Sequence, residues 1–380
     1  DETGWSVTQV TAVFPIFGVI AAVIAPALGF GFDRIGPRPL LTMGLLLMGA
    51  GLVLMGQAKS LPMFYVAFIV ANIGSTSIWM ATAPAVANWF VRMRGRALGV
   101  YTLGFGLAGI MSPLLFQLIE TVGWRDALLI VGIVTWALLP VSVWVIRRRP
   151  EDVGQWPDGA DGPPATNDDG GSGEINVSAG KALRTRTFWL LSIGSMMVFL
   201  TISALQVHWS PLLQSVGFSE RSAANLLFVL PLSTVVGRIG FGFLVDIWDK
   251  RRMAAVAFVL QGIAVFVLTQ VEADRWWLLP AFFVFWGLGF GGTVVTRPAL
   301  QAEMFGRFSF GAINGILFMT GEAGFALAPH IASLGFESMG SYTPVFLAFG
   351  VLSVLAAPIV LAMRKPGPPV APLLPGDERL

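Results

Sequence analysis

Apolar runs of about 20 residues, separated by short polar segments, follow one another along almost the whole chain. A helix of about 20 apolar residues is long enough to cross the ~30 Å hydrocarbon core of a bilayer. We therefore predict an all-α, multi-pass integral membrane protein with eleven spans. The predicted spans are residues 8–32, 39–57, 61–87, 97–119, 127–146, 187–213, 222–246, 253–270, 276–298, 309–333 and 341–363.

Composition supports a membrane protein and excludes several soluble classes. Hydrophobic residues make up 55% of the chain and charged residues only 12%, with a mean hydropathy of +0.74. A soluble domain carries about 25% charged residues, so a chain of this composition could not cover a soluble surface. The net charge of +2 is too small to indicate a nucleic-acid partner. Cysteine is absent, and no nucleophile, phosphate-binding or metal-binding motif is present. We therefore expect no enzyme, no cofactor and no metal site.

Positive charges are distributed unevenly between the two sets of alternate loops. Nineteen of the 24 Lys and Arg residues fall in one set, in which we include Arg297, and four fall in the other. Arg238 is the remaining one and lies inside a span. Because cytoplasmic loops carry the excess of Lys and Arg, we expect the middle loop and the C-terminus to be cytoplasmic. From the Ala-, Gly- and Arg-rich, lysine-poor composition we expect, by analogy, a protein of a bacterial inner (plasma) membrane.

A polar stretch in the middle of the chain separates two halves. Residues 147–186 are rich in Gly, Pro and Asp, which is typical of a flexible tether. We expect an N-terminal helical half, a cytoplasmic linker, a C-terminal helical half and a cytoplasmic tail. They cover residues 1–146, 147–186, 187–363 and 364–380.

The two halves share a motif at the cytoplasmic end of a span, 213 residues apart: Gly29-x3-Asp33-x4-Arg38 and Gly242-x3-Asp246-x4-Arg251. The stretches 90–99 and 305–315 echo each other at nearly the same offset. Two echoes at almost one offset indicate duplicated halves, which is a known design of membrane transporters.

The two aspartates of this motif form the centre of a candidate cytoplasmic gate. Arginines of neighbouring loops can pair with them, and such pairs would form when the protein faces outward and break when it faces inward. The candidate gate residues are Asp33, Arg34, Arg38, Arg96, Asp246 and Arg251. The alternative is that these charges only set the topology.

Two ionisable residues lie deep inside predicted spans, where charges are costly and point to function. Arg238 lies about 12 Å from a cytoplasmic helix end and can bind a carboxylate bidentately. Glu322 lies about 18 Å from the same side. It is the proton-coupling candidate, because a low-dielectric environment disfavours a charged carboxyl group. The alternative is that Glu322 is a permanent counter-ion of Arg238, and the two hypotheses are not exclusive.

Three further polar residues inside spans are candidates for substrate binding. His208 lies near the outer end of its span, and a histidine there is more often a packing residue. Tyr101 and Asn72 can bond either a neighbouring helix or a substrate. Together with Arg238 and Glu322 they form the predicted substrate-binding set.

Several stretches resemble the major facilitator superfamily. GFGFDRIGPRPLL (29–41) is similar to the family's signature loop between helices 2 and 3, and GFLVDIWDKRR (242–252) to its copy between helices 8 and 9. NWFVRMRGRALG (88–99) resembles the loop between helices 4 and 5. Family members have twelve helices, but here the signature loop follows the first predicted span. The resemblance therefore implies that the eleven spans match family helices 2–12 and that helix 1 is missing, as in a truncated or partial sequence; a true eleven-helix protein is the alternative.

Other stretches resemble the monocarboxylate transporter family and the oxalate/formate antiporter group. These are TGWSVTQV (3–10), VHWSPLLQSVGFSERSAANLL (207–227) and VVGRIGFGFLVD (235–246). The resemblance places the carboxylate-binding arginine of those families on Arg238. Thr234 stands where monocarboxylate transporters have an aspartate, and Gly321 and Glu322 stand where oxalate transporters have a lysine. One cation suits a monoanion better than a dianion, so the resemblance disfavours oxalate.

We therefore expect a secondary active transporter that moves a small organic anion, a monocarboxylate, by alternating access. The sequence is compatible with coupling to protons and with exchange against a second anion. One alternative is a facilitator-type exporter of hydrophobic or drug-like compounds. An alternative of another class is a non-transporting membrane receptor or scaffold, which would predict degraded gate motifs.

Overall fold

The computed structural model describes residues 5, 9, 13–162 and 177–365 of the 380-residue chain, and these residues are almost entirely helical. The long helices are α2 (Val13–Ile35), α3 (Pro37–Gly56), α4 (Leu61–Trp89), α5 (Arg94–Gly106), α6 (Ala108–Ala137), α9 (Arg186–Ser215), α10 (Glu220–Ile247), α11 (Lys250–Leu268), α12 (Leu279–Phe305), α13 (Phe310–Met339) and α14 (Thr343–Leu361). The short elements are α7 (Leu139–Trp144), η1 (Pro150–Val153), η2 (Pro157–Gly159), α8 (Ala179–Ala182) and η3 (Ala273–Leu278).

The described residues contain ten helical stretches that are long and apolar enough to cross a membrane. One of them, Arg94–Trp144, has 51 residues, about twice the length that one crossing needs. It divides at Gly123, where φ 82° and ψ 160° interrupt the helix. Before this point the chain runs along α10, where Gly109 lies beside Phe228, and after it along α3, where Trp136 donates a hydrogen bond to the Leu46 carbonyl. The stretch therefore crosses twice, which gives eleven spans in the described part of the chain.

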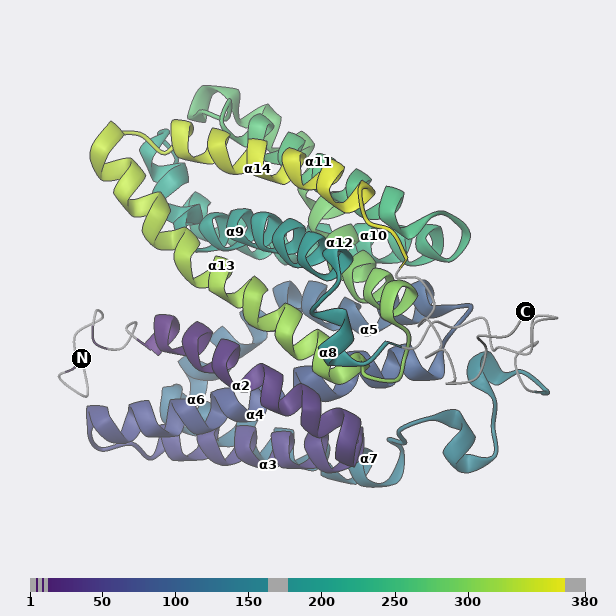
Figure 1. Ribbon diagram of the computed structural model, residues 1–380. Helices are drawn as coiled ribbons and strands as arrows, with labels where there is room; N and C mark the ends of the chain where they lie inside the picture. The colour runs from purple at the N-terminus through teal and green to yellow at the C-terminus, as the bar shows by residue number, and fades with distance from the viewer. Residues whose placement is uncertain (1–4, 6–8, 10–12, 163–176, 366–380) are drawn as a thin grey trace, which may run out of the picture.

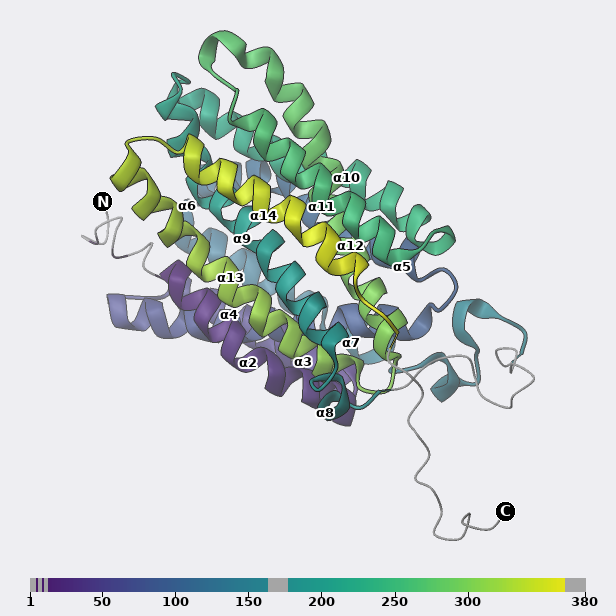
Figure 2. The same cartoon turned by 45° about the horizontal axis from the view of Figure 1, so that its top comes forward.

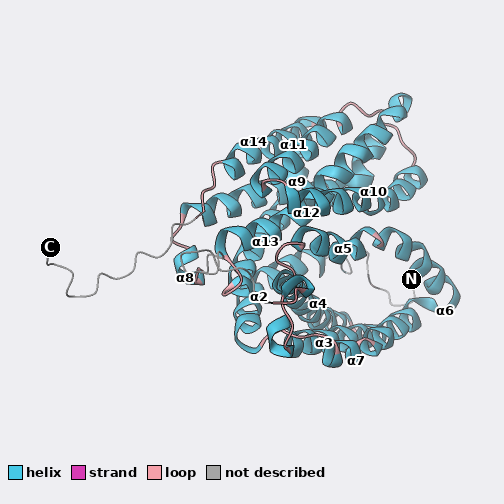
Figure 3. Ribbon diagram, turned by 90° about the vertical axis from the view of Figure 1, so that its right-hand side faces the viewer, coloured by secondary structure: helices cyan, strands magenta, loops and turns pink. Residues whose placement is uncertain are grey.

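The helices form two groups that lie side by side (Figure 1). Helices α2–α7 make the lower, purple-to-blue group, and α9–α14 make the upper, teal-to-yellow group. The groups are seen separately from one end of the bundle (Figure 3), while in a turned view part of the lower group lies behind the upper one (Figure 2). We call the end of the bundle at which α7 ends and α9 begins the linker end.

Contacts between the two groups are made mainly by two helix pairs, α2 with α13 and α5 with α10. Glycines let the backbones of these pairs approach closely near the linker end. A Cβ atom at Gly95 would lie 2.5 Å from the Gly242 carbonyl oxygen, and one at Gly311 would lie 2.5 Å from that of Gly29. Small residues at a helix interface are the usual means of close packing in a membrane.

The apolar core is divided in the same way as the helices. The largest cluster of buried side chains lies within residues 177–363, apart from Leu98, and includes Trp209, Phe282 and Trp286. Smaller clusters centre on Met80 in α4 and on Phe64 at the other end of that helix. The predicted domain limits at residues 146 and 187 stay a prediction.

The predicted flexible tether is wrong for the first part of the linker. Residues 150–161 contain the two short helices η1 and η2 and lie against the linker end of the bundle, with Pro150 and Pro157 buried. The acidic and glycine-rich stretch 163–176 lies outside the described residues. The composition of residues 147–186 predicts a lack of regular structure. It carries no information on the tertiary hydrogen bonds that hold residues 150–161 in place.

Gly123 gives a test of the chain reversal. Its φ and ψ fall in a region open essentially to glycine alone, so Gly123→Ala should destabilise the protein by about 1–3 kcal/mol. The measurement is the thermal unfolding of purified protein in detergent. Gly104→Ala is the matched control. Both glycines have open space where a Cβ would go, but Gly104 lies within α5 and alanine should be neutral or stabilising there. Equal effects of the two substitutions would contradict a special backbone conformation at Gly123.

Candidate functional site

Arg238 lies in the interior of α10, where the two groups of helices meet. It is nine residues before the end of the helix, about 13 Å from the linker end, and its side chain is 3% exposed. Its Nε donates a hydrogen bond to the Thr234 hydroxyl (3.0 Å), and its Nη1 donates to the Thr102 carbonyl of α5 (2.6 Å). The guanidinium lies 5.8 Å from the ring centres of Phe105 on α5 and Phe290 on α12. One cation thus contacts both groups of helices.

No carboxylate lies within 4.0 Å of Arg238 among the described residues. Two aromatic faces and two neutral oxygens stabilise the cation, but they do not neutralise it. A buried charge without a counter-ion carries a desolvation cost of several kcal/mol. The arrangement therefore suits the binding of an anion, whose charge would complete the site.

Glu322 does not serve as the counter-ion of Arg238. It lies in α13, is 9% exposed, and its electrostatic partner is Arg297 of α12. The prediction that places Arg297 in a cytoplasmic loop is wrong, because α12 continues to Phe305 and contains it. The predicted span 276–298 already contains Arg297, although this residue was counted with the loop cations, and the span stops at Pro298, seven residues short of the end of α12. Pro298 nevertheless lies inside the helix, as neighbouring helices in a bundle permit.

Tyr101 and Asn72 bond neighbouring residues on helices. The Tyr101 hydroxyl is 2.6 Å from that of Thr82 on α4, and its ring lies 6.0 Å from that of Trp79. Trp79 also packs edge-on against Phe105, at 4.7 Å between ring centres. Tyr101, Trp79 and Phe105 therefore form a row of aromatic rings that ends beside Arg238. Asn72 is buried; its Oδ1 accepts a hydrogen bond from the Thr76 hydroxyl one turn along α4 (3.4 Å), while its Nδ2 has no partner among the described residues.

His208 has partners for both ring nitrogens. Its Nε2 donates to the Pro329 carbonyl (3.0 Å), which leaves Nδ1 to accept from the Tyr342 hydroxyl (3.3 Å). Both partners belong to the same group of helices as His208. This geometry favours the packing alternative for His208 over substrate binding.

In the candidate gate, two carboxylates join the groups of helices, because each binds the N-terminal end of a helix from the opposite group. Asp246 at the end of α10 accepts hydrogen bonds from the backbone N–H groups of Gly95 (2.5 Å) and Arg96 (3.1 Å) in the first turn of α5. Asp33 at the end of α2 accepts from Gly311 (2.9 Å) and Ala312 (2.8 Å) in the first turn of α13. The two contacts are equivalent, as expected from the motif that the two halves share.

The arginines of the gate play unequal parts. Arg96 lies 3.5 Å from Asp246 and stacks on Phe243. Arg34 and Arg38 have exposed side chains at the linker end. The expectation that arginines are the main partners of Asp33 is corrected, since its carboxylate binds backbone N–H groups, while Arg148 donates to its carbonyl oxygen. A helix N-terminus supplies unsatisfied N–H groups and partial positive charge, so a carboxylate there needs no arginine.

Arg251 pairs within its own group of helices. It bonds Asp249 (3.0 Å), which begins α11, and the Met363 carbonyl. The hydrogen bond from Arg251 lowers the pKa of the partly exposed Asp249 carboxyl below its ordinary value. Arg251 thus stabilises the start of α11 and makes no contact across the gate that the described residues reveal.

The ordered part of the linker joins the gate. The Asp158 carboxylate accepts hydrogen bonds from the backbone N–H groups of Val91, Arg92 and Met93, just before α5. Asp158 has a left-handed conformation (φ 60°), which is uncommon for a residue other than glycine. Glu151 lies 3.6 Å from Arg307, which also donates to the Asn88 carbonyl (3.1 Å). The linker therefore bridges the loops that precede α5 and α13.

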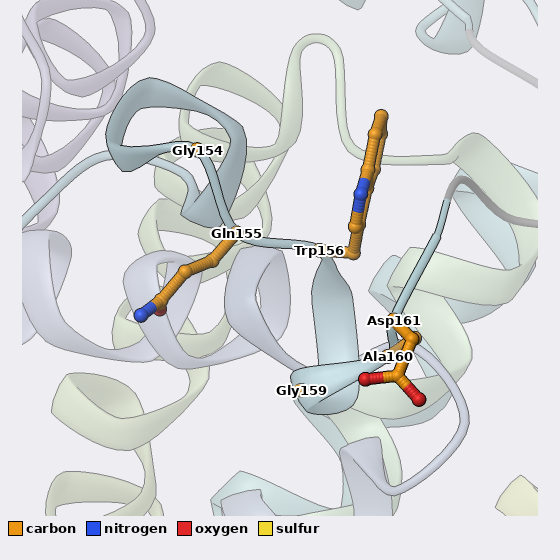
Figure 4. A pocket seen from close by; sticks show the side chains of 6 residues that line it. All are labelled: Gly154, Gln155, Trp156, Gly159, Ala160 and Asp161. Carbon is orange, nitrogen blue, oxygen red and sulfur yellow. The ribbon is translucent and has the colours of Figure 1, made fainter.

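A surface pocket of about 390 Å³ lies on the linker, lined by Gly154, Gln155, Trp156, Gly159, Ala160 and Asp161 (Figure 4). Its one charged lining residue is an acid. The Gln155 and Trp156 side chains point away from each other, and none of the lining residues belongs to α10, which carries Arg238, or to the helices that contact it. It does not suit an anion and is not the candidate site.

The sequence did not predict a place in the site or the gate for four residues: Arg297, Phe105, Phe290 and Asp158. Arg297 lies inside the predicted span 276–298, but it was counted with the loop cations and was therefore not considered as a charge at membrane depth. The two phenylalanines have no signal of their own among 29 in the chain. Asp158 lies in a segment whose composition suggests only a tether.

Comparison with known proteins gives consistent matches along the chain. A family model described as Major Facilitator Superfamily matches residues 1–241 and 191–379. Monocarboxylate transporter 12 of Rattus norvegicus is 25% identical over 386 residues, which cover 94% of this chain and 78% of that protein. The oxalate:formate antiporter of Oxalobacter formigenes is 24% identical over 388 residues, covering 100% of this chain and 88% of that protein. The solved structure of FucP in an outward conformation has a TM-score of 0.73 at 12% identity, covering 96% of this chain and 92% of FucP.

The gate contacts give a second prediction. Asp246→Asn removes charge-assisted hydrogen bonds worth about 1.5–3 kcal/mol. It should therefore shift the linker end toward open forms by roughly tenfold or more. Because the chain has no cysteine, spin labels on introduced cysteines at the exposed positions Pro39 and Arg252 can report the opening as a longer distance in pulsed electron paramagnetic resonance.

Asp249→Asn is the matched control for this experiment. It makes the same acid-to-amide change at the linker end, but Asp249 bonds only residues at the start of α11 among those described. The distance distribution of this variant should stay as in the unsubstituted protein. An unchanged distribution in Asp246→Asn would show that the carboxylate does not hold the two groups of helices together.

Proposed function

Because this chain belongs to the Major Facilitator Superfamily of transporters, we propose that it is a secondary active transporter whose cargo is a small carboxylate anion, a monocarboxylate, moved by alternating access. The observation that carries the proposal is the buried Arg238 guanidinium without a carboxylate partner within 4.0 Å in the described residues. A carboxylate would supply the missing charge in a planar geometry that matches the guanidinium. The relatives named monocarboxylate transporter 12 and oxalate:formate antiporter support a carboxylate cargo.

The linker end is the cytoplasmic side in this proposal. Most Lys and Arg residues of the chain fall in its loops, as the positive-inside rule requires of a cytoplasmic face. The structure then represents an outward-facing form, because Asp33 and Asp246 hold the linker end closed. The likeness to FucP in its outward conformation supports this assignment. The membrane is a bacterial plasma membrane.

Binding and gating meet at the contact between Arg238 and Thr102. The Nη1 atom of Arg238 donates across the two groups of helices to the Thr102 carbonyl of α5. An incoming carboxylate competes for this donor, and its binding weakens one contact between α5 and α10. The Asp246 contact to the start of α5 lies on the same helix pair. The cargo can therefore bias the gate because it interacts differently with the two states.

The competing function, an exporter of hydrophobic or cationic compounds, would need an acid free to face the cargo. Glu322 is the acid at membrane depth in the described helices, and Arg297 acts on its charge. A receptor or scaffold without transport would not need a gate, yet both aspartates make their contacts. The geometry therefore favours transport of an anion.

Substitution of Arg238 tests the proposal. Arg238→Gln keeps a hydrogen-bonding side chain but removes the charge, so it should weaken carboxylate binding by about 2–5 kcal/mol, a loss of roughly 30-fold or more. The measurement is counterflow of labelled lactate, pyruvate and formate in proteoliposomes. Arg252→Gln, at an exposed arginine of α11, is the matched control and should transport normally. Saturable carboxylate counterflow that survives in Arg238→Gln would contradict the assignment.

A further inference from the structure

Arg297 is a cation inside the bundle for which the proposed function gives no role. It lies eight residues before the end of α12, about 12 Å from the linker end. Its guanidinium lies 5.6 Å from the ring centre of Phe199 on α9. Its Nε and Nη2 atoms are buried and have no hydrogen-bond partner in the part of the chain that the structure describes. Buried donors are almost always paired, so two unused donors on one guanidinium point to a ligand.

Arg297 and Arg238 are connected through α12. Phe290, whose ring lies beside Arg238, precedes Arg297 by seven residues, or two helical turns. Residues seven apart lie on the same face of a helix, about 10 Å apart along its axis. The face of α12 that meets Arg238 therefore also carries Arg297, two helical turns closer to the linker end than Phe290. A ligand with two acidic groups could engage both arginines with their long side chains.

Glu322 is the acid that acts on Arg297, and it is nearly buried. The two do not form an ion pair within 4.0 Å among the described residues. Their charges therefore influence each other, while the Arg297 donors remain unoccupied. Neutralising Glu322 would leave Arg297 without a nearby opposite charge.

No other ionisable group of the described helices adds a charge beside Arg238, Arg297 and Glu322. Tyr101 bonds Thr82, and both nitrogens of His208 are engaged near the other end of the bundle. His330 is exposed. The remaining ionisable side chains of α12, α13 and the described helices packed against them lie near helix ends.

The charges of the site can be counted for its two protonation states. With Glu322 ionised, Arg238, Arg297 and Glu322 together carry one positive charge, which a monocarboxylate neutralises. With Glu322 protonated they carry two, which a dicarboxylate neutralises. Because uncompensated charge is costly at this depth, each protonation state selects its own class of anion.

We propose that Arg297 is a second anion-binding residue of the transport site, and that Glu322, by holding or releasing one proton, sets whether the site takes a small dicarboxylate or a monocarboxylate. The inference rests on the proposed carboxylate transport through Arg238. A dicarboxylate dianion enters with one proton on Glu322, and a monocarboxylate enters with Glu322 ionised. The dianion together with the proton on Glu322 carries the same net charge as the monocarboxylate alone, so exchange of one cargo for the other moves a proton and no net charge.

The test uses substitutions that fix the charge of the site at neutral pH. Labelled lactate counterflow is measured in proteoliposomes, with unlabelled malonate as the competing dicarboxylate. Glu322→Gln fixes two positive charges, so malonate should inhibit roughly tenfold more strongly than in the unsubstituted protein, as expected when a unit charge a few ångströms away is removed. Arg297→Gln leaves no net charge and should impair lactate exchange and malonate inhibition together.

The double variant Arg297→Gln/Glu322→Gln distinguishes charge selection from a structural role. It restores one positive charge at Arg238, so lactate exchange should recover while malonate inhibition stays lost. Arg297→Lys, which keeps the charge, should retain part of the malonate inhibition and shows that a folded protein is being measured. A double variant no better than Arg297→Gln, or unchanged malonate inhibition in Glu322→Gln, would overturn the inference.

The proposed function can fail separately. If the unsubstituted protein shows no lactate counterflow, the carboxylate assignment itself is wrong, and the dicarboxylate inference loses its basis. If lactate counterflow depends on Arg238 but malonate inhibition is the same in every Arg297 and Glu322 variant, the inference alone is wrong.

Discussion

Two carboxylates at the ends of helices hold the two groups of helices together at the linker end. Asp33 of α2 binds the first turn of α13, and Asp246 of α10 binds the first turn of α5. A helix N-terminus inside a membrane protein must have its free N–H groups satisfied, and each aspartate does this for a helix of the other group. The interaction requires close approach of the backbones, which the glycines at positions 29, 95, 242 and 311 permit. These contacts keep the interior of the bundle, where Arg238 lies, closed at the linker end.

The charged interior follows from this arrangement. Arg238 can be buried without a nearby carboxylate because α5 supplies the Thr102 carbonyl and the Phe105 ring, and α12 supplies Phe290. These groups come from both sides of the interface, so the environment of the arginine is complete only while the halves are together. Arg297 and Glu322 lie on one side, within α12 and α13. Their charges therefore stay together when the interface changes, whereas Arg238 loses partners.

The linker adds a third connection at the same end. Asp158 binds the backbone before α5 in the same manner as the gate aspartates bind helix starts. Glu151 reaches Arg307, which also bonds the end of α4. The linker, which connects the two halves covalently, thus also takes part in the contacts that close them, with Asp158 on backbone N–H groups and Glu151 beside the Arg307 guanidinium.

The sequence by itself determined the elements and their membrane character. Apolar runs of about 20 residues predict spans because a bilayer admits helices whose backbone groups are satisfied internally. The repeated Asp33 and Asp246 motifs and the intramembrane Arg238 and Glu322 are visible for the same reason, since charge in an apolar run is rare. Only the tertiary structure decided the partners. It assigned Glu322 to Arg297 rather than to Arg238, extended α12 past Pro298, and gave Asp33 backbone N–H groups in place of arginines. Distances between residues that are hundreds of positions apart depend on how helices pack, and hydropathy along the chain carries no record of that packing.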